Sequence, residues 1–257
     1  MSRLRFGVPA LNGCEFLALP DGTELAYQHC AGRGPGILFC AGFNSDMQGD
    51  KALALEAWCR AQGRQFTRFD YFGHGQSSGS LEQGCIGRWR DDALVMLDEI
   101  TSGPQLVVGS SMGGWIMLLV AQARPGRVAG LVGVAAAPDF TERIRNERLS
   151  EAQLRQLADT GYCDMPNHYD DGQSYRISRQ LLDEGREHLL LEKEIAIDVP
   201  VRLLHGQCDE DVPWRHALSI AAALTSSDVE VCLIKSGDHR LSQPKDLQRL
   251  TRTIEAL

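Results

Sequence analysis

The chain has 257 residues, of which 43% are hydrophobic, 23% charged and 7% aromatic. This composition is that of an ordinary globular protein, and a chain of this length buries enough surface to form a core without a metal or a disulfide, which excludes a disordered or fibrous protein. Its 26 Lys and Arg face 34 Asp and Glu, a formal net charge of −8. That sign is wrong for a surface that neutralises phosphates, so we expect no nucleic-acid partner.

The sequence contains no apolar run of about 18 residues, the length that a membrane span requires, so we expect no membrane span. Its first ten residues, MSRLRFGVPA, lack the apolar stretch of a signal peptide and do not resemble a mitochondrial presequence. We therefore expect a cytoplasmic protein. In that compartment the eight cysteines are expected to be free thiols, and none forms a C-x-x-C pair at zinc spacing, so we expect no metal site.

The predicted elements begin with residues 15–19 and 24–30, which flank Pro20-Asp21-Gly22 and should form an antiparallel hairpin. After it, short β-rich runs alternate with stretches of helical length, which indicates parallel strands joined by helices. The expected strands are 36–42, 65–70, 105–110, 128–136, 201–206 and 229–237. The expected helices are 49–62, 87–100, 112–124, 214–225 and 244–256. The sequence predicts an α/β class with a mostly parallel eight-stranded sheet and helices on both faces.

Residues 141–198 interrupt this alternation and are too long for a plain crossover. They contain 8 basic and 13 acidic residues, a net charge of −5. Their apolar residues at helical spacing are Ile144, Leu149, Leu154 and Leu157. We expect a helical cap insertion over one end of the sheet, with residues 1–140 and 199–257 as the core.

Two segments match the nucleophile pattern G-x-S-x-G, residues 75–79 and residues 109–113. The second follows an apolar strand and opens onto an apolar helix, so its serine lies at a sharp strand-to-helix turn where the helix N-terminus favours an anion. The first lies in a polar, glycine-rich loop with no such helix after it. The context favours Ser111 over Ser77 as a nucleophile.

A serine hydroxyl needs a base and a carboxylate that orients the base. His239 follows the last strand and is the expected base. The other histidines, which we interpret as structural or, for His74, as a weaker candidate for contact with substrate, are His29, His74, His168, His188, His205 and His216. The carboxylate candidates are Asp209 and Asp211 after strand 201–206, and Asp139 after the preceding strand.

The chain order of serine, aspartate and histidine is that of α/β-hydrolases, and the sequence resembles serine α/β-hydrolases over nearly its whole length. The segments that carry the resemblance are 38–46, 68–79, 107–115, 205–214 and 237–240. Residues 51–63, 68–79, 201–214 and 236–240 together are similar to the subgroup that contains a mitochondrial acyl-glucuronide esterase with palmitoyl-protein thioesterase activity. In that family the acid is the aspartate of D-x-x-V-P, which implies Asp209.

The resemblance also implies an α/β-hydrolase fold and an oxyanion hole formed by the backbone N–H groups of Phe43 and Met112. The usual His-Gly before the first of these is here Ala41-Gly42, so the histidine is missing. No cofactor is implied. The expected substrate is a small acyl ester or thioester, or an S-acylated protein, cleaved through an acyl-enzyme.

Two alternatives keep the same fold: a cofactor-free perhydrolase or lyase that uses the same triad, and a non-catalytic small-molecule-binding protein on the hydrolase scaffold. A preference for acyl glucuronides would require Arg143, Arg145 or Arg148 to face the pocket. On a charged helix we expect these arginines to be solvated.

Overall fold

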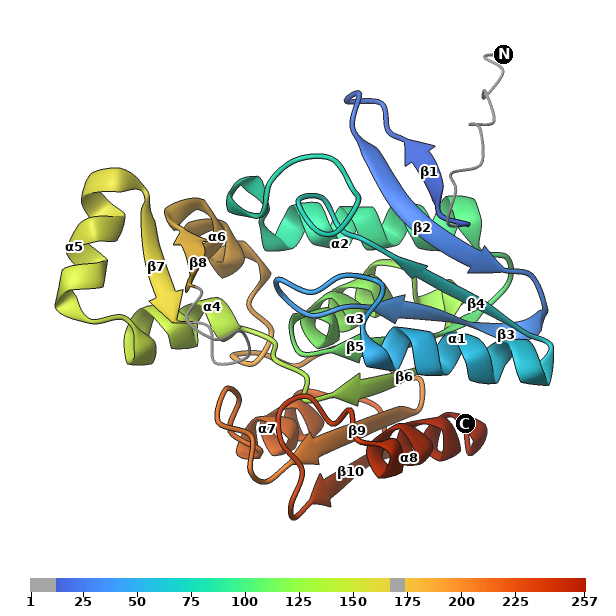
Figure 1. The fold of residues 1–257 in the computed structure, drawn as a ribbon. Coiled ribbons are helices and arrows are strands. Elements are labelled where there is room, and N and C mark those ends of the chain that lie inside the picture. Colours follow the sequence, from blue (N-terminus) through green and yellow to red (C-terminus); the bar gives the residue numbers. More distant parts are fainter. Residues whose placement is uncertain (1–12, 167–173) are drawn as a thin grey trace.

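The centre of the computed structural model, which describes residues 13–166 and 174–257, is an eight-stranded sheet of order β1-β2-β4-β3-β5-β6-β9-β10 (Figure 1). Its strands are β1 (Glu15–Ala18), β2 (Glu24–Cys30), β3 (Arg33–Cys40), β4 (Arg64–Phe69), β5 (Gln105–Ser110), β6 (Val128–Val134), β9 (Val201–Gly206) and β10 (Val229–Ile234). β2 pairs antiparallel with β1 and with β4, and the pairs from β4 through β10 are parallel. The predicted mostly parallel eight-stranded sheet is confirmed.

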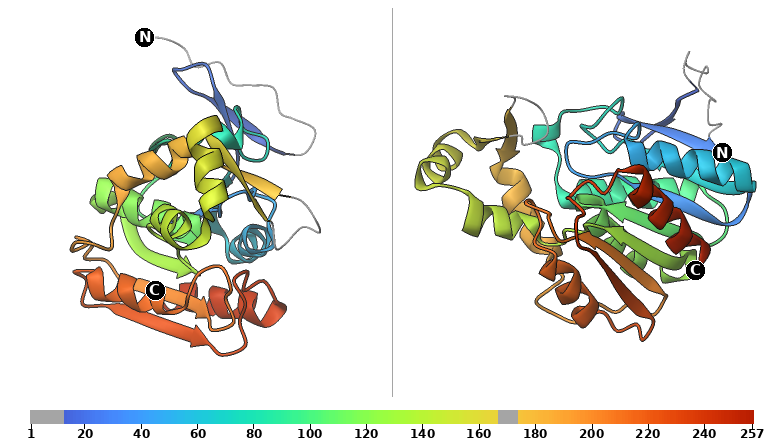
Figure 2. Two further views of the ribbon diagram at one scale, coloured as in Figure 1. Left: turned by 90° about the vertical axis from the view of Figure 1, so that its left-hand side faces the viewer. Right: turned by 60° about the horizontal axis from the view of Figure 1, so that its bottom comes forward.

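Helices cover both faces of the sheet, with α1 and α8 packed together on one face and α2, α3 and α7 on the other (Figures 1 and 2). Their bounds are α1 (Asp50–Gln62), α2 (Ile86–Val95), α3 (Met112–Ala123), α7 (Arg215–Ala223) and α8 (Pro244–Glu255). The predicted helix 87–100 changes its hydrogen-bonding pattern along its length, because Met96–Ile100 form a π-helical turn after α2. Within the two described ranges, no helix is both long and apolar enough to cross a membrane.

Strand β5 and the helix that follows it are deeply buried. Every residue of β5 is buried, and so are the α3 residues from Met112 to Ala121. A central parallel strand is covered on both faces, which is why the middle of β5, residues 106–108, is an apolar run. The turn between β5 and α3 therefore lies between two buried elements.

The insertion between β6 and β9 lies beyond the carboxyl ends of the parallel strands (Figure 1). It contains α4 (Phe140–Arg143), the π-helical turn Ile144–Arg148, α5 (Glu151–Thr160), β7 (Tyr162–Pro166), β8 (Ser174–Ser178), α6 (Arg179–Glu184) and a 3₁₀ turn, Gly185–His188.

The insertion is helical as expected, but β7 and β8 add an antiparallel hairpin that the sequence did not predict. The apolar residues at helical spacing do not form one helix, because Ser150 starts a new one and caps it with Gln153. His168 lies outside the described residues.

Candidate active site

Ser111 lies at the turn between β5 and α3 in a strained conformation, with φ 54° and ψ −119°. A non-glycine residue in such a conformation costs roughly 1–3 kcal/mol and persists only where neighbours hold it. Here the Ser111 N–H donates to the carbonyl of Val134 at 2.9 Å, and its carbonyl accepts from the N–H groups of Gly114 at 2.8 Å and Ala137 at 3.0 Å. The end of β6 and the first turn of α3 thus hold the serine in place.

Gly113 allows α3 to approach the end of β3. A Cβ at this position would clash with the carbonyl oxygens of Cys40 and Ala41. The close approach brings the loop after β3 against the serine, since an ideal Cβ on Gly42 would lie 3.4 Å from the Cβ of Ser111. The glycine of the motif therefore joins the expected nucleophile to the expected oxyanion loop.

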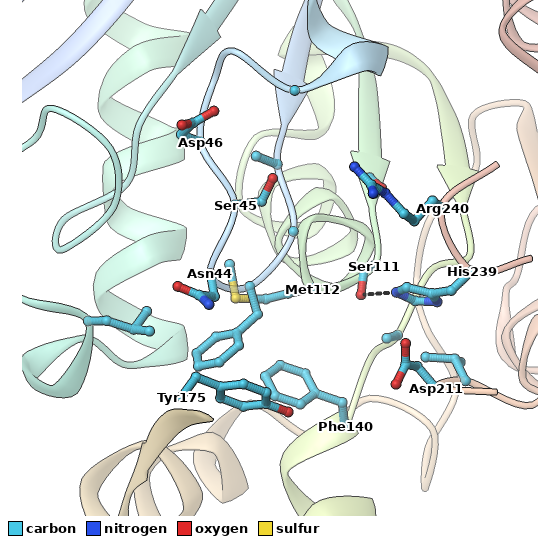
Figure 3. Close-up of a pocket in the computed structure, with 18 of the residues that line it drawn as sticks. Asn44, Ser45, Asp46, Ser111, Met112, Phe140, Tyr175, Asp211, His239 and Arg240 are labelled. Carbon is cyan, nitrogen blue, oxygen red and sulfur yellow. Dashed lines mark hydrogen bonds between the residues drawn. The ribbon is translucent and has the colours of Figure 1, made fainter. Parts of the chain in front are cut away.

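His239 and Asp209 complete a row of hydrogen bonds that starts at the serine. His239 Nε2 lies 3.0 Å from Ser111 Oγ, and His239 Nδ1 lies 2.8 Å from Asp209 Oδ2 (Figure 3 shows the first of these). The Asp209 side chain is fully buried and that of His239 is 14% exposed. The three residues come from three different loops at the carboxyl edge of the sheet, in the predicted order.

The loops that carry Asp209 and His239 touch each other through a glycine. A Cβ on Gly206 would clash with the backbone of Gly237. The turn after β9 and the turn after β10 can therefore pack this closely only because residue 206 is a glycine. Lys51, in the first turn of α1, donates from Nζ to the carbonyl of Arg240 at 2.5 Å. This hydrogen bond connects α1 to the loop that carries His239.

The Asp209 carboxylate is surrounded by hydrogen-bond donors. Oδ1 accepts from the N–H groups of Asp211 at 2.9 Å and Val212 at 2.8 Å. On the other side, His205 Nε2 lies 3.1 Å from Oδ2. Burial opposes ionisation of this carboxyl, but the hydrogen bonds from His205 and His239 outweigh burial and hold the pKa of Asp209 well below its usual range. The acid is therefore ionised throughout the physiological pH range.

Asp209, Asp211 and His239 offer possible metal-ligand atoms within 4.8 Å of one another. The hydrogen bond between His239 Nδ1 and Asp209 requires a proton on that nitrogen, because an ionised carboxylate only accepts. A protonated ring nitrogen is not a metal ligand, so this group fits a hydrogen-bonded pair better than a metal site.

The loop after β3 carries Phe43 and is supported from below by His74. The N–H of Asn44 donates to His74 Nε2 at 3.2 Å, and His74 Nδ1 lies 3.2 Å from the carbonyl of Phe72. Burial lowers the pKa of His74 to about 4, so its ring is neutral at physiological pH. The sequence made His74 a weaker candidate for contact with substrate, whereas in the structure its ring contacts the backbone of the loop that carries Phe43.

A pocket of about 1050 Å³ opens above the serine. One side is aromatic: Phe43 contacts Tyr175 and Phe140 with ring centroids 5.6 Å and 6.0 Å apart. The other side is polar and includes Ser45 and Arg240 (Figure 3). Tyr175 comes from β8 of the insertion, so sequence reasoning missed it together with the hairpin.

The three arginines singled out in the insertion take different positions. Arg143 and Arg148 line the pocket. Arg145 instead pairs with Asp183 within the insertion. Arg148 lies 3.5 Å from Asp211, which also lines the pocket, so this ion pair links the insertion to the turn that carries Asp209. We expected all three arginines to be solvated. In the structure each side chain is only 20–24% exposed, so most of each side chain is covered by the protein.

The other candidates have structural partners. Ser77 Oγ accepts from the N–H of Ala26 at 2.9 Å and donates to the carbonyl of Asp70 at 2.6 Å. Of the remaining histidines, His29 contacts Thr67, His188 contacts Glu184, and His216 contacts the carbonyl of Pro138.

Asp139 holds the two ends of the insertion together. Its Oδ1 accepts from the N–H of Leu190 at 2.9 Å, and its Oδ2 accepts from the N–H of Leu191 at 2.8 Å. Asp139 itself directly precedes α4, at the start of the insertion. Its carboxylate therefore joins the start of the insertion to residues 190 and 191. Both of its oxygens are used by these backbone N–H groups, and neither contacts His239.

Comparison with known proteins identifies relatives over nearly the whole chain. Residues 36–162 match a family model described as the alpha/beta hydrolase fold. The mitochondrial palmitoyl-protein thioesterase ABHD10 of Bos taurus is 43% identical over 242 residues, which cover 94% of this chain and 79% of that protein.

Two solved structures are similar at comparable coverage. Alpha/beta hydrolase domain-containing protein 10 from mouse superposes with a TM-score of 0.87 at 40% identity, covering 95% of this chain and 97% of that one. A putative hydrolase from Agrobacterium vitis S4 gives a TM-score of 0.89 at 35% identity, covering 95% and 98%.

The prediction of a cytoplasmic protein is wrong on this evidence, because the bovine relative is a mitochondrial protein. The prediction depended mainly on the lack of an apolar stretch in the first ten residues. Such a stretch separates secreted proteins from others, but it does not separate the cytoplasm from mitochondria. The fold, the chain order of serine, aspartate and histidine, and the 43% identity lead to one conclusion: the chain belongs to the α/β-hydrolase family, in the group that contains the ABHD10 thioesterases.

Proposed function

We propose that this protein is a serine hydrolase that cleaves carboxylic esters or thioesters of acyl substrates through an acyl-enzyme. The observation that carries the proposal is the row of hydrogen bonds from Ser111 through His239 to Asp209, which starts at the pocket and ends at a buried carboxylate. In this proposal Ser111 is the nucleophile, His239 the general base and Asp209 the residue that orients and charge-balances it.

In the first half of the reaction, Ser111 Oγ attacks the acyl carbonyl carbon while His239 Nε2 takes the hydroxyl proton. The ionised Asp209 stabilises the imidazolium that forms. The N–H groups of Phe43 and Met112 donate to the oxyanion, and each donor of this kind contributes roughly 10² to 10³ in rate. The C–S or C–O bond then breaks, and the leaving group takes the proton from His239.

In the second half, a water molecule repeats the attack. His239 takes a proton from the water as its oxygen bonds to the acyl carbon, and the bond to Ser111 Oγ then breaks. The proton returns to Ser111, which restores the enzyme and releases the carboxylic acid. Because His239 accepts a proton in each half, the neutral ring is the active form and kcat/KM should rise with pH.

The insertion, residues 141–198, acts in this proposal as a cap that shapes the acyl site. Phe140 and Tyr175 stand with Phe43 beside Ser111 and offer an apolar wall for an acyl chain of medium or long length. The name of the bovine relative, a palmitoyl-protein thioesterase, supports a thioester of a long acyl group, carried by a small molecule or by a protein.

The first experiment labels the purified protein with a fluorophosphonate, with Ser111→Ala as the control. Labelling of the wild type and not of the variant is expected. A protein that stays unlabelled would be a binding protein on the hydrolase scaffold.

The second experiment compares kcat/KM for C4, C8 and C16 acyl thioesters with that for a matched amide. A thiolate departs with little help, whereas an amine must first be protonated by a well-placed His239, so the thioesters should be cleaved much faster. An amide cleaved as fast as the thioesters would contradict the proposal.

A further inference from the structure

His205 lies directly behind the acid of the proposed triad, at the end of β9. Its side chain is 1% exposed and its Nε2 lies 3.1 Å from Asp209 Oδ2, the same oxygen that His239 Nδ1 contacts at 2.8 Å. Ser111, His239, Asp209 and His205 therefore form one row of four side chains that runs from the pocket into the core.

The contacts of His205 define its protonation. Nε2 faces two oxygen acceptors, Asp209 Oδ2 and the carbonyl of Val212 at 3.0 Å, so it carries a proton and donates. Nδ1 is buried and has no hydrogen-bond partner among residues 13–166 and 174–257. A second proton on Nδ1 would place a charged donor without an acceptor in the core, which is strongly unfavourable. The contacts therefore assign Nε2 as the nitrogen that donates to Asp209.

We propose that His205 is a positioning residue for Asp209, which holds the carboxylate in place and moderates the basicity of His239; this inference rests on the proposed serine-hydrolase function. The backbone N–H groups of Asp211 and Val212 fix Asp209 Oδ1, and His205 supplies a donor on the side of Oδ2.

The donor from His205 stabilises the charged form of Asp209. A carboxylate whose charge is already shared among several donors attracts an imidazolium less strongly. His205 therefore keeps His239 neutral, and able to take the serine proton, down to a lower pH. The fourth side chain widens the acidic side of the working range.

Replacement of His205 by a neutral side chain leaves every surrounding charge in place. Charged and titratable groups lie near the row on every side. Beside the acid they are Asp211 and Arg148, beside the histidine loop Asp50, Lys51, Asp238 and Arg240, and beside His205 they are His216 with Asp139 and Arg143. A changed pH profile would therefore report the lost donor and not a lost charge.

The test compares His205→Phe, which removes the donor from a ring-shaped side chain, with His205→Gln, whose amide restores an N–H near Nε2. His216→Phe is the matched control, because His216 is also an enclosed histidine whose Nε2 contacts a carbonyl, that of Pro138 at 2.7 Å. For each protein, kcat and KM for an activated ester are measured from pH 5 to 9. The ring of His239 is also titrated by NMR without substrate.

For His205→Phe we expect kcat on the pH plateau to fall roughly tenfold with KM little changed, the effect of one charge-assisted hydrogen bond. We also expect the midpoint of both pH profiles to rise by about half a pH unit, a fraction of that same interaction. His205→Gln and His216→Phe should stay within about threefold of wild type and keep its midpoint. If the phenylalanine variant does not fold in a thermal melt, His205→Leu, a smaller side chain without a donor, replaces it.

A midpoint that stays unchanged or falls in the donor-free variant would overturn the proposal, as would a glutamine variant that behaves like phenylalanine. The NMR titration separates this failure from a failure of the proposed function, since it requires no turnover. If Ser111→Ala keeps its activity while the His239 midpoint still moves, the serine-hydrolase mechanism is wrong and the role of His205 toward Asp209 stands.

Discussion

The two G-x-S-x-G segments of this chain, residues 75–79 and 109–113, share a pattern and use their serines in opposite ways. Ser77 Oγ is occupied by the backbone, since it accepts from Ala26 N–H and donates to the Asp70 carbonyl. Ser111 Oγ instead faces a histidine ring in a pocket. The comparison teaches that the motif supplies a tight turn, and that the elements on either side decide whether the hydroxyl supports the fold or faces a ligand.

The difference extends to the backbone. The backbone of Ser111 has a positive φ of 54°, whereas that of Ser77 does not have a positive φ. The N–H of Ser77 donates to the carbonyl of His74 in an ordinary turn. The strain at Ser111 is sustained by β5 and α3, both buried almost completely. A loop without such flanking elements has no means to hold a serine in that conformation.

The largest expected effect comes from removing each serine hydroxyl in turn. Ser111→Ala should lower kcat for an activated ester by a factor on the order of 10⁶, as the loss of a triad nucleophile does. Ser77→Ala should keep near-normal turnover but lower the free energy of unfolding by about 1–3 kcal/mol, because it leaves the Ala26 N–H without an acceptor. Ester kinetics and urea unfolding measure the two effects. Loss of turnover in the Ser77 variant alone would reverse the comparison.

The second prediction applies the same test to two carboxylates that are two residues apart. Asp209→Asn should lower kcat by roughly 10⁴, because an amide favours the wrong tautomer of His239. Asp211→Asn should change kcat little, since its carboxylate pairs with Arg148 and its N–H, which the substitution keeps, donates to Asp209 Oδ1. Steady-state kinetics of both variants decide the matter. Equal effects would mean that the ion pair to the insertion matters as much as the contact with His239.

The smallest expected effect concerns His74, next to the first motif, and is a change of stability with pH. Burial lowers the pKa of His74 to about 4 in the folded state. Between pH 6.5 and 4 the unfolded chain therefore binds a proton that the folded one excludes. This group should cost up to about 1.4 kcal/mol of stability per pH unit as the pH falls through that interval.

The measurement is urea unfolding at several pH values for wild type and His74→Gln, because a difference between the two cancels the other titrating groups. The variant should lose less stability on acidification. Parallel curves would show that His74 is not the neutral support of the oxyanion loop.

The sheet and the serine turn were predictable because their signals are local. The strand Gln105–Ser110 is buried throughout and apolar in its middle because it is covered on both faces, and the apolar helix after it marks the turn at Ser111. The hairpin of β7 and β8 was not predictable, because each strand has only five residues. So short an alternation, as of Cys163 and Met165 facing inward, is hard to distinguish from a loop.

The pocket and the fourth side chain of the row depend on contacts between distant segments. His205 lies in an apolar strand, which predicts burial but not what lies behind the ring. Its contact with Asp209 follows from the turn after β9, which the carbonyl groups of Ile234 and Gly237 on the β10 side hold through Gln207 and Cys208. A histidine four residues before the candidate acid was the available signal.

Asp139 ties the start of the insertion to Leu190 and Leu191 near its end, so the base of this long excursion is closed by hydrogen bonds. These hydrogen bonds hold the chain leaving β6 next to the chain that returns toward β9, so for the sheet the insertion is equivalent to a short loop. The entropy of closing a loop grows only slowly with its length, by about 0.6 kcal/mol per doubling. A segment of different length grafted above that closure would leave the strands below unmoved, so substrate range can diversify through exchange of the insertion while the reaction chemistry stays constant.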